Sequence, residues 1–432
     1  MASYLHNILN SMKRGDHLNY IEEILSLSMR LLKYESVYGH GGITPNAVVG
    51  KTILECHREM LNYCQSIGLT TYLDSEGMYS YAETGQADSY IAILVHLDVV
   101  PAGDQEQWEH PPFEPVIIED KLIGRGAADD KVPAAIAVLA VKKLLDIGVS
   151  LKYPIRIVFG SDEETGFRCI EKYKRMHAPP KFTLIFDGTF PFAFSEKHLL
   201  NYELRTDIDV DVYGGESYNS VMDHVVWKNG EDIVTVSGKS AHASRPTLGE
   251  NALIKLAYIN SEANDLFKLV NQLFEPSGHH KLPFLKEVPE KDDVTMCLGM
   301  VRDGKMYVDL RVPPELKLAT FIESFEASMR ALGISPVQND VLKGSITDVH
   351  SDFSKAVLRC YREVTGDYES QPFVTGSATY GRSYASNCIS FGPRMHYHIT
   401  NTHKPNEFVS FDLIENAFAI YVHTLKTMEE EL

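Results

Sequence analysis

The apolar run at residues 90–95 constrains the fold of this chain more than any other feature. Its six residues, Tyr-Ile-Ala-Ile-Leu-Val, predict a strand buried on both faces, as in parallel sheets that helices cover. Further strand-like runs follow at 153–159 and 182–186, and residues 134–145 have strongly helical spacing. This alternation predicts an α/β domain with a mostly parallel sheet covered by helices.

The pattern changes near residue 194, where a second module begins. With 432 residues, the chain is longer than the about 250–300 at which one hydrophobic core usually divides. Alternating β-branched stretches and one helical stretch follow, at 200–212, 225–236 and 251–273. We therefore expect an α+β domain over residues 194–345, inserted into a discontinuous domain over 1–193 and 346–432.

Net charge and cysteine usage exclude some classes of protein. A formal net charge of −18 argues against nonspecific binding of nucleic acid, which needs a basic surface. The six cysteines form no Cys-x-x-Cys pair, as expected of buried thiols in a reducing compartment. The first 14 residues lack the apolar core of a signal peptide, and no run of about 18 apolar residues predicts a transmembrane helix. We expect a cytoplasmic protein without nucleic-acid or membrane partners, either an enzyme or a binding protein.

A histidine and an aspartate follow the apolar run directly. Because side chains two positions apart on a strand share one face, His96 and Asp98 are expected to point toward the same spot. A carboxylate beside an imidazole orients the ring and raises its basicity, which suits a metal ligand. The alternative is two polar residues at a point where a strand leaves the core, so the pair needs partners elsewhere in the chain.

Acidic side chains recur where strands end or helices begin. Asp129 and Asp130 lie between a glycine-flanked turn and an expected helix, where an N-cap explains only one of them. Glu163 and Glu164 follow another apolar run. Neighbours on an extended chain point in different directions, so one suits a metal ligand and the other a general base. Asp187 follows a further apolar run. The alternative is a solvated turn for the segment with Glu163 and an ordinary Asp-Gly turn for Asp187.

Three histidines, His396, His398 and His403, crowd into one segment near the C-terminus. Such crowding is typical of metal or acid–base sites, with an exposed loop as the alternative. In open α/β sheets the carboxyl ends of the strands line the binding crevice, where the acidic segments are expected to lie. Histidines and carboxylates together suit a centre of two metal ions about 3.5–4 Å apart.

Five segments, taken in order, carry a resemblance to a known family. They are His96-Leu-Asp-Val-Val-Pro, Gly124-Arg-Gly-Ala-Ala-Asp-Asp-Lys, Asp162-Glu-Glu-Thr-Gly, Asp187-Gly-Thr-Phe-Pro and His403-Lys-Pro-Asn-Glu. With these segments the chain resembles the M20 family of dinuclear metallopeptidases, most closely the bacterial dipeptidase V branch. The resemblance covers nearly the whole chain and implies a catalytic domain that carries an inserted lid domain.

The resemblance implies a role for each residue of the expected metal centre. One divalent ion would be bound by His96, Asp129 and Asp187, and the other by Asp129, Glu164 and His403. Asp98 would orient His96 without touching metal. Glu163 would take a proton from the attacking water and pass it to the leaving amine. Zn²⁺ or Mn²⁺ is expected, with Co²⁺ as a further option, because carboxylates and imidazoles suit all three.

The resemblance also assigns residues to the substrate. His242, in Ser240-Ala-His-Ala-Ser, would stabilise the oxyanion from the lid. Asn219 and Arg311 would hold the substrate backbone and carboxylate from the lid. Arg382, at the end of a glycine-containing loop, would contact the carboxylate through its forked donors.

The expected function is that of a metal-dependent dipeptidase acting on dipeptides with a free N-terminus, as a monomer or homodimer. An N-acyl amino acid deacylase or desuccinylase of the same fold is the alternative. A noncatalytic, metal-stabilised binding protein is a third hypothesis. The presence of both Glu163 and His242 argues against it, because neither is needed merely to hold metal.

Overall fold

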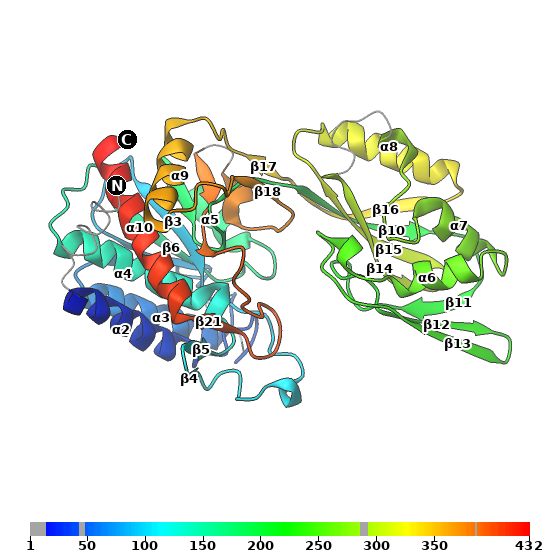
Figure 1. The fold of residues 1–432 in the computed structure, drawn as a ribbon, viewed down its shortest axis with the longest axis horizontal. Coiled ribbons are helices and arrows are strands. Elements are labelled where there is room, and N and C mark those ends of the chain that lie inside the picture. The colour runs from blue at the N-terminus through cyan, green and yellow to red at the C-terminus, as the bar shows by residue number, and fades with distance from the viewer. Residues whose placement is uncertain (1–13, 43–47, 286–292, 385–386) are drawn as a thin grey trace. The chain divides into compact units, whose positions relative to one another are not determined.

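The computed structural model describes residues 14–42, 48–285, 293–384 and 387–432, with side chains from residue 19 onward. The chain start, on which the signal-peptide expectation rests, lies outside these residues. The chain forms two compact units, the first of Met1–Phe194, Thr347–Phe373 and Thr379–Leu432, and the second of Ser195–Ile346 and Val374–Ala378 (Figure 1). The expected class, an α/β fold with an inserted α+β part, is confirmed.

The large sheet is parallel at its centre and antiparallel toward its edges. Its order is β1-β2-β6-β3-β7-β19-β9-β17, with β18 beside β9. Strand β3 pairs in parallel with β6 and β7, and β19 pairs in parallel with β7. The strands are β1 (Thr70–Leu73), β2 (Tyr79–Glu83), β3 (Ile91–His96), β6 (Ile155–Gly160), β7 (Phe182–Ile185), β9 (Ala193–Glu196), β17 (Ser345–Ile346), β18 (Phe373–Thr375) and β19 (Cys388–Ser390). All six residues of β3 are buried, as the apolar run predicts.

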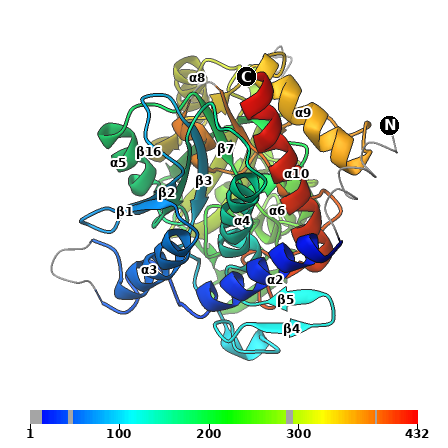
Figure 2. The same cartoon turned by 90° about the vertical axis from the view of Figure 1, so that its left-hand side faces the viewer.

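Helices cover both faces of this sheet. The helices of the first unit are α2 (Arg14–Leu31), α3 (Lys51–Ser66), α4 (Val132–Asp146), α5 (Arg168–Met176), α9 (Asp352–Thr365) and α10 (Phe411–Glu431). All but α5 share one hydrophobic core with alternate residues of β3. Helix α5 packs on the opposite face, where Tyr173 meets Tyr79 edge to face at 5.3 Å. Figure 2 shows α4 and α10 side by side.

Two small sheets complete the first unit. Strand β5 (Lys121–Ile123) pairs with β4 (Val116–Ile118) and with β21 (Phe408–Ser410), both antiparallel. Strand β20 (Pro393–Arg394) pairs in parallel with β8 (Gly188–Thr189). These pairs join segments that are far apart in the sequence, so they fix the C-terminal part of the chain against its middle.

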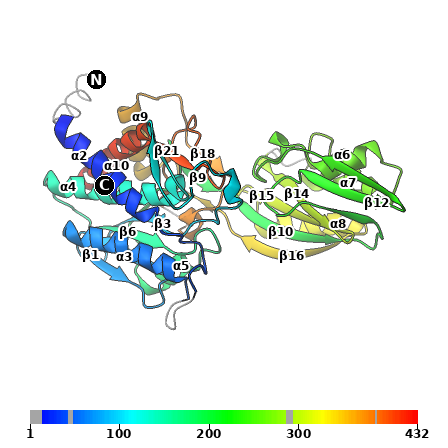
Figure 3. The same ribbon diagram turned by 90° about the horizontal axis from the view of Figure 1, so that it is seen from below.

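The second unit is an antiparallel sheet with helices on one face. Its order is β13-β12-β11-β14-β15-β10-β16. The elements are β10 (His198–Arg205), β11 (Asp211–Gly214), β12 (His224–Asn229), β13 (Asp232–Ser237), β14 (Thr295–Arg302), β15 (Lys305–Val312), β16 (Ser335–Leu342), α6 (Ala252–Ile259), α7 (Asp265–Leu273) and α8 (Leu318–Ala331). Leu200, Tyr202 and Leu204 alternate along β10 and pack into one core with all three helices. Figure 3 shows α6 and α7 side by side.

Three elements expected as single pieces are divided in this unit. The stretch 200–212 contains β10 and β11, and 225–236 is a hairpin of β12 and β13 that turns after Asn229 with Gly230 at φ +66°. The helix expected at 251–273 is α6 followed by α7, because Asn264 caps a new helix start. Across the described ranges, no helix is both long and apolar enough to cross a membrane.

Candidate metal centre

Three neighbouring parallel strands end at the same edge of the first unit's sheet. Because β6, β3 and β7 lie in this order, the residues that follow them come together. His96 is the last residue of β3, Glu163 and Glu164 follow β6, and Asp187 follows β7. The strand order therefore brings four predicted site residues to one place.

Asp129 and His403 come from two irregular segments. Asp129 lies in the turn η2 (Ala127–Lys131), where its φ of −145° and ψ of 91° are not helical. Gly126 precedes the turn at φ +86°, and a Cβ there would lie 2.7 Å from Val99 Cγ1, so any side chain would be strained. His403 has φ +62°, which is uncommon for a residue with a side chain. The backbone of each segment is therefore irregular at its site residue.

Asp129 turns its two carboxylate oxygens toward two different histidines. Oδ1 lies 2.9 Å from His96 Nε2, and Oδ2 lies 3.1 Å from His403 Nε2. Glu164 Oε1 lies 3.1 Å from the same nitrogen of His403. Asp187 Oδ2 lies 3.9 Å from His96 Nε2. The cluster thus has two halves that share Asp129.

Asp98 supports both His96 and the glutamate pair. Its main-chain carbonyl accepts a hydrogen bond from His96 Nδ1 at 3.0 Å, and its Oδ1 lies 3.5 Å from the same nitrogen. Because a carbonyl only accepts, Nδ1 carries a hydrogen, and Nε2 is the ring nitrogen that faces Asp129. The Asp98 carboxylate accepts the N–H groups of Glu163 and Glu164 at 3.2 and 3.1 Å. Asp98 therefore contacts the ring mainly through its carbonyl, while its carboxylate holds the turn with both glutamates.

Burial and neighbouring charges shift the pKa values of the carboxylates and of His403 in this cluster. Burial raises the pKa of Glu163 well above its usual range. Burial also raises the pKa of Glu164 to about 7 and that of Asp187 to about 6, and the nearby charge of Asp129 adds to both. At Asp129, burial has the same tendency, but hydrogen bonds from both histidines outweigh it and hold the pKa well below its usual range. Burial would lower the pKa of His403, yet its bonds to Asp129 and Glu164 raise it to about 11.

The donor atoms fit divalent metal ions. The ligand atoms of His96, Glu163 and Asp187 lie within 4.8 Å of one another. Those of His96, Asp129 and Glu164 form a second such group. Oε1 of Glu163 is buried without a hydrogen-bond partner among the described residues, which is unusual for a buried carboxylate. Carboxylate and imidazole donors without thiolates suit Zn²⁺, Mn²⁺ and Co²⁺, and no described cysteine joins either group.

Within the described residues, His403 alone of the three C-terminal histidines joins this cluster. His398 Nε2 lies 3.3 Å from Asp412 Oδ2 at the start of α10, and its Nδ1 accepts the N–H of Met395 at 3.2 Å. The ring of His396 lies edge to face against its neighbour in the sequence. The crowding of histidines therefore predicts the correct segment, but two of the three histidines have contacts outside the cluster.

Three further residues beside the cluster had no predicted role. Asp130 accepts the N–H of His96 at 3.1 Å, and Arg394 Nη2 lies 3.9 Å from Asp187 Oδ1. Glu407 is fully buried and accepts hydrogen bonds from the main chain of η2. Asp130 and Glu407 stand within the segments that carry the family resemblance, which is the sequence signal for them. Arg394 has no such signal.

The second unit brings Asn219 and His242 onto adjacent segments. Ser220 forms an isolated β-bridge with His242, and the N–H of Ala243 donates to the carbonyl of Asn219 at 2.9 Å. Ser244 donates its N–H to His242 Nδ1 at 3.2 Å, so Nδ1 is an acceptor and Nε2 carries the hydrogen of the neutral ring. The exposed imidazole thus has the N–H donor that oxyanion stabilisation requires.

Arg311 is buried within the second unit. Its Nε and Nη2 donate to the two carboxylate oxygens of Asp309 at 2.6 and 2.7 Å, and its Nη1 donates to the Gly376 carbonyl at 2.7 Å. Asp309 is a partner that sequence reasoning missed. Arg382 lies in η6 (Tyr380–Ser383) of the first unit and is half-buried. The structure therefore places Arg311 and Arg382 in different units.

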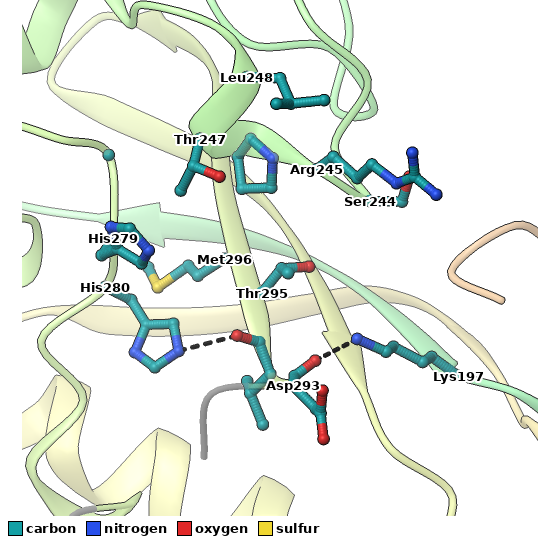
Figure 4. A pocket seen from close by; sticks show the side chains of 13 residues that line it. Lys197, Ser244, Arg245, Thr247, Leu248, His279, His280, Asp293, Thr295 and Met296 are labelled. Carbon is teal, nitrogen blue, oxygen red and sulfur yellow. Dashed lines mark hydrogen bonds between the residues drawn. The ribbon is translucent and has the colours of Figure 1, made fainter. Parts of the chain in front are cut away.

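A pocket of about 380 Å³ lies in the second unit (Figure 4). Basic side chains line it, namely Lys197, Arg245, His279 and His280. Lys197 donates to the main-chain carbonyl of Asp293, and His280 Nε2 to the next carbonyl along the chain at 3.0 Å, both dashed in Figure 4. His279 Nδ1 also lies 2.9 Å from Ser277 Oγ, so at least three of the four basic side chains are hydrogen-bonded within the unit. No residue predicted to contact substrate is among the described residues that line the pocket.

Comparison with known proteins identifies the family. The protein named "Putative dipeptidase SH1171" of Staphylococcus haemolyticus is 27% identical over 462 residues, covering 95% of this chain and 97% of that protein. Human carnosine dipeptidase 1 shares the fold with a TM-score of 0.65 at 13% identity, covering 96% of this chain and 97% of that one. The M20 family metallo-carboxypeptidase Sso-CP2 of Sulfolobus solfataricus does so with a TM-score of 0.61 at 19% identity, covering 94% and 99%. Since the model of the peptidase family M20/M25/M40 matches residues 92–427, which are most of the sequence, this chain belongs to that family.

Proposed function

We propose that this protein is a metal-dependent dipeptidase that hydrolyses the peptide bond of dipeptides with a free N-terminus. One observation carries the proposal: the two oxygens of Asp129 face His96 and His403, as a carboxylate shared by two ions would. The name of the staphylococcal relative and the fold shared with a carnosine dipeptidase support the substrate class.

The proposed ligands divide as the distances do. His96, Asp129 and Asp187 would hold one divalent ion, and Asp129, Glu164 and His403 the other. The donor set favours Zn²⁺ or Mn²⁺, with Co²⁺ as a substitute. We assign residues 1–193 and 346–432 to the catalytic domain and residues 194–345 to the lid. All six cysteines are free and buried, which supports a cytoplasmic location.

Glu163 is the proposed general base. Ions at this centre supply polarisation of the scissile carbonyl and a lower pKa of water. The Glu163 carboxylate, whose buried Oε1 has no partner among the described groups, takes a proton from the attacking water as the new C–O bond forms. The same proton passes to the leaving amine as the C–N bond breaks. His242 donates its Nε2 hydrogen to the oxyanion, and Asn219, Arg311 and Arg382 contact the substrate.

A substrate panel tests this proposal. The purified protein, loaded with Zn²⁺ or Mn²⁺, is offered dipeptides with a free N-terminus and their N-acylated counterparts. We expect the free dipeptides to be cleaved faster, and Glu163→Gln to lower kcat by roughly 10²–10⁴-fold while metal content is unchanged. Glu429→Gln, which changes a buried glutamate that no site residue contacts, is the matched control.

Three outcomes would contradict the proposal. Absence of turnover with every metal would exclude a dipeptidase. Faster cleavage of the N-acylated substrates would favour the deacylase alternative. Unchanged activity of Glu163→Gln would remove Glu163 from the mechanism.

A further inference from the structure

Glu407 makes four hydrogen bonds from a fully buried position. Arg125 Nη1 and the N–H of Gly126 donate to its Oε2 at 2.5 and 3.2 Å. The N–H groups of Ala128 and Asp129 donate to its Oε1 at 2.8 and 3.1 Å. The turn that carries Asp129 lies directly before α4 and is not helical, so Glu407 provides acceptors that the main chain there does not supply.

The same residue ends the loop that carries His403. In this loop φ is positive at Asn401 (+51°), His403 (+62°) and Asn406 (+57°). Residues with a side chain disfavour positive φ, so contacts with other parts of the chain must stabilise the conformation of this loop. On the outer side, Asn406 Oδ1 accepts the N–H of Glu109 at 2.8 Å. At the end of the loop, the buried Glu407 contacts η2. It is followed by β21, which pairs with β5 (Figure 1).

The charge of Glu407 is balanced locally. Arg125 is as deeply buried as its partner, and its guanidinium carbon lies 5.2 Å from the ring centre of Trp108. No contact joins the Glu407 carboxylate to the described side chains of the metal centre, since its partners are Arg125 and main-chain N–H groups. Its contacts with the turn that carries Asp129 are therefore made through main-chain N–H groups.

We propose that Glu407 is a positioning residue that sets the separation of Asp129 from His403. In the molecule these two side chains meet at 3.1 Å, between Asp129 Oδ2 and His403 Nε2. Glu407 thereby determines the affinity for the ion that they share with Glu164. The inference rests on the proposed function, because that function assigns these side chains to metal.

Glu407→Gln tests the inference with Co²⁺ as the probe. Glutamine matches glutamate in size but turns an NH₂ group toward N–H donors at one of the two oxygens. By titration calorimetry on the metal-free full chain, we expect two Co²⁺ ions per wild-type chain. We expect the variant to keep one and to bind the other at least tenfold more weakly. The visible spectrum of bound Co²⁺ should change, and kcat should fall with KM nearly constant.

Glu429→Gln separates positioning from a merely structural role. Glu429 is buried in the same unit and accepts the N–H groups of Lys152 and Tyr153 at 2.5 and 3.0 Å, away from every predicted ligand. If Glu407 only stabilises the fold, both variants melt earlier and both keep wild-type Co²⁺ affinity, which overturns the inference. Glu407→Asp keeps the charge opposite Arg125 with a shorter reach, and decides the matter if Glu407→Gln does not fold.

The results distinguish this inference from the proposed function. Wild-type affinity for both ions in Glu407→Gln or Glu407→Asp overturns the positioning role and leaves the dipeptidase standing. A wild-type chain that binds two ions but cleaves no dipeptide overturns the function and leaves the positioning role standing. A wild-type chain that binds fewer than two ions overturns the inference.

Discussion

His57 allows a prediction about acid stability that the structure makes quantitative. The ring is fully buried in α3, with Nδ1 2.7 Å from Ser80 Oγ and Nε2 2.8 Å from Ser161 Oγ. Ser161 Oγ also lies 2.7 Å from the Gly77 carbonyl, which only accepts. Ser161 therefore gives its hydrogen to Gly77 and accepts one from Nε2, while Ser80 donates to Nδ1. The neutral ring is fully satisfied, and a second proton would break the bond from Ser80.

The expected loss of stability follows from the pKa of His57. Burial lowers this pKa from its ordinary 6.5 to about 4. Above pH 6.5 the ring is neutral in the folded and the unfolded chain. Between pH 6.5 and 4 the unfolded chain binds a proton that the folded chain does not, so the free energy of unfolding falls as the pH falls. About 2.5 pH units at about 1.36 kcal/mol each give about 3 kcal/mol.

The assay compares His57→Gln with the parent chain between pH 7 and pH 4. The chain has two tryptophans, Trp108 in the first unit and Trp227 in the second, so a Trp227→Phe background leaves Trp108 to report the first unit. Urea unfolding is followed by fluorescence with a chelator present, since bound metal adds its own pH dependence. His57→Gln should be less stable at pH 7, and the difference should shrink by about 3 kcal/mol toward pH 4. His350→Gln, at an exposed histidine, is the control.

A constant difference between His57→Gln and the parent chain would refute the reasoning. It would mean that His57 takes up its proton equally in both states, so the buried hydrogen bonds would not exclude the charged ring. A difference that grows on acidification would give the opposite sign and would place a charged imidazole in the core.

Three further predictions concern the metal, a buried carboxylate and a glycine. Removal of divalent ions should lower the melting temperature reported by Trp108 by several degrees, because about 3 kcal/mol of binding free energy is lost. The melting temperature reported by Trp227 should not change, and equal shifts of the two would contradict the prediction. Asp98→Asn should lower the free energy of unfolding in urea by about 1–3 kcal/mol and should lower kcat, because one of the N–H groups of Glu163 and Glu164 loses its acceptor. Wild-type values of both quantities would contradict this prediction. Gly376→Ala would place a Cβ 2.6 Å from Ser244 Cβ and should destabilise the second unit by about 1–3 kcal/mol in the Trp227 signal; a wild-type unfolding curve would count against that contact.

Much of the site follows from strand ends that the sequence marks. His96, Glu164 and Asp187 each follow an apolar run, and parallel strands end at a common edge, so their meeting could be predicted. The role of Glu407 could not. The sequence shows an acid after Asn406, but the N–H groups that it meets belong to a turn whose backbone departs from the helix that local preference would favour.

The fold was less predictable where local signals are weak. Helix α5 has the sequence Arg-Cys-Ile-Glu-Lys-Tyr-Lys-Arg-Met, in which Cys169, Ile170 and Tyr173 are the buried residues. These residues stand at helical spacing, but the helix is only nine residues long, so the apolar pattern is too short to mark it. In the second unit, α6 and α7 pack into the same core, so apolar spacing runs through the break between them. Only Asn264, the cap of α7, marks the new start.

The pairing of β21 with β5 has a consequence for biosynthesis. The segment with His403 follows the central strands β3, β6 and β7 in the chain, so it leaves the ribosome after them. Until then β5 has one partner strand in place of two, and Arg125 lacks the carboxylate that balances it. The central strands can form early, because domains fold as the chain emerges. A nascent chain can therefore form its central strands before the proposed metal ligand His403 and the partner of Arg125 have emerged.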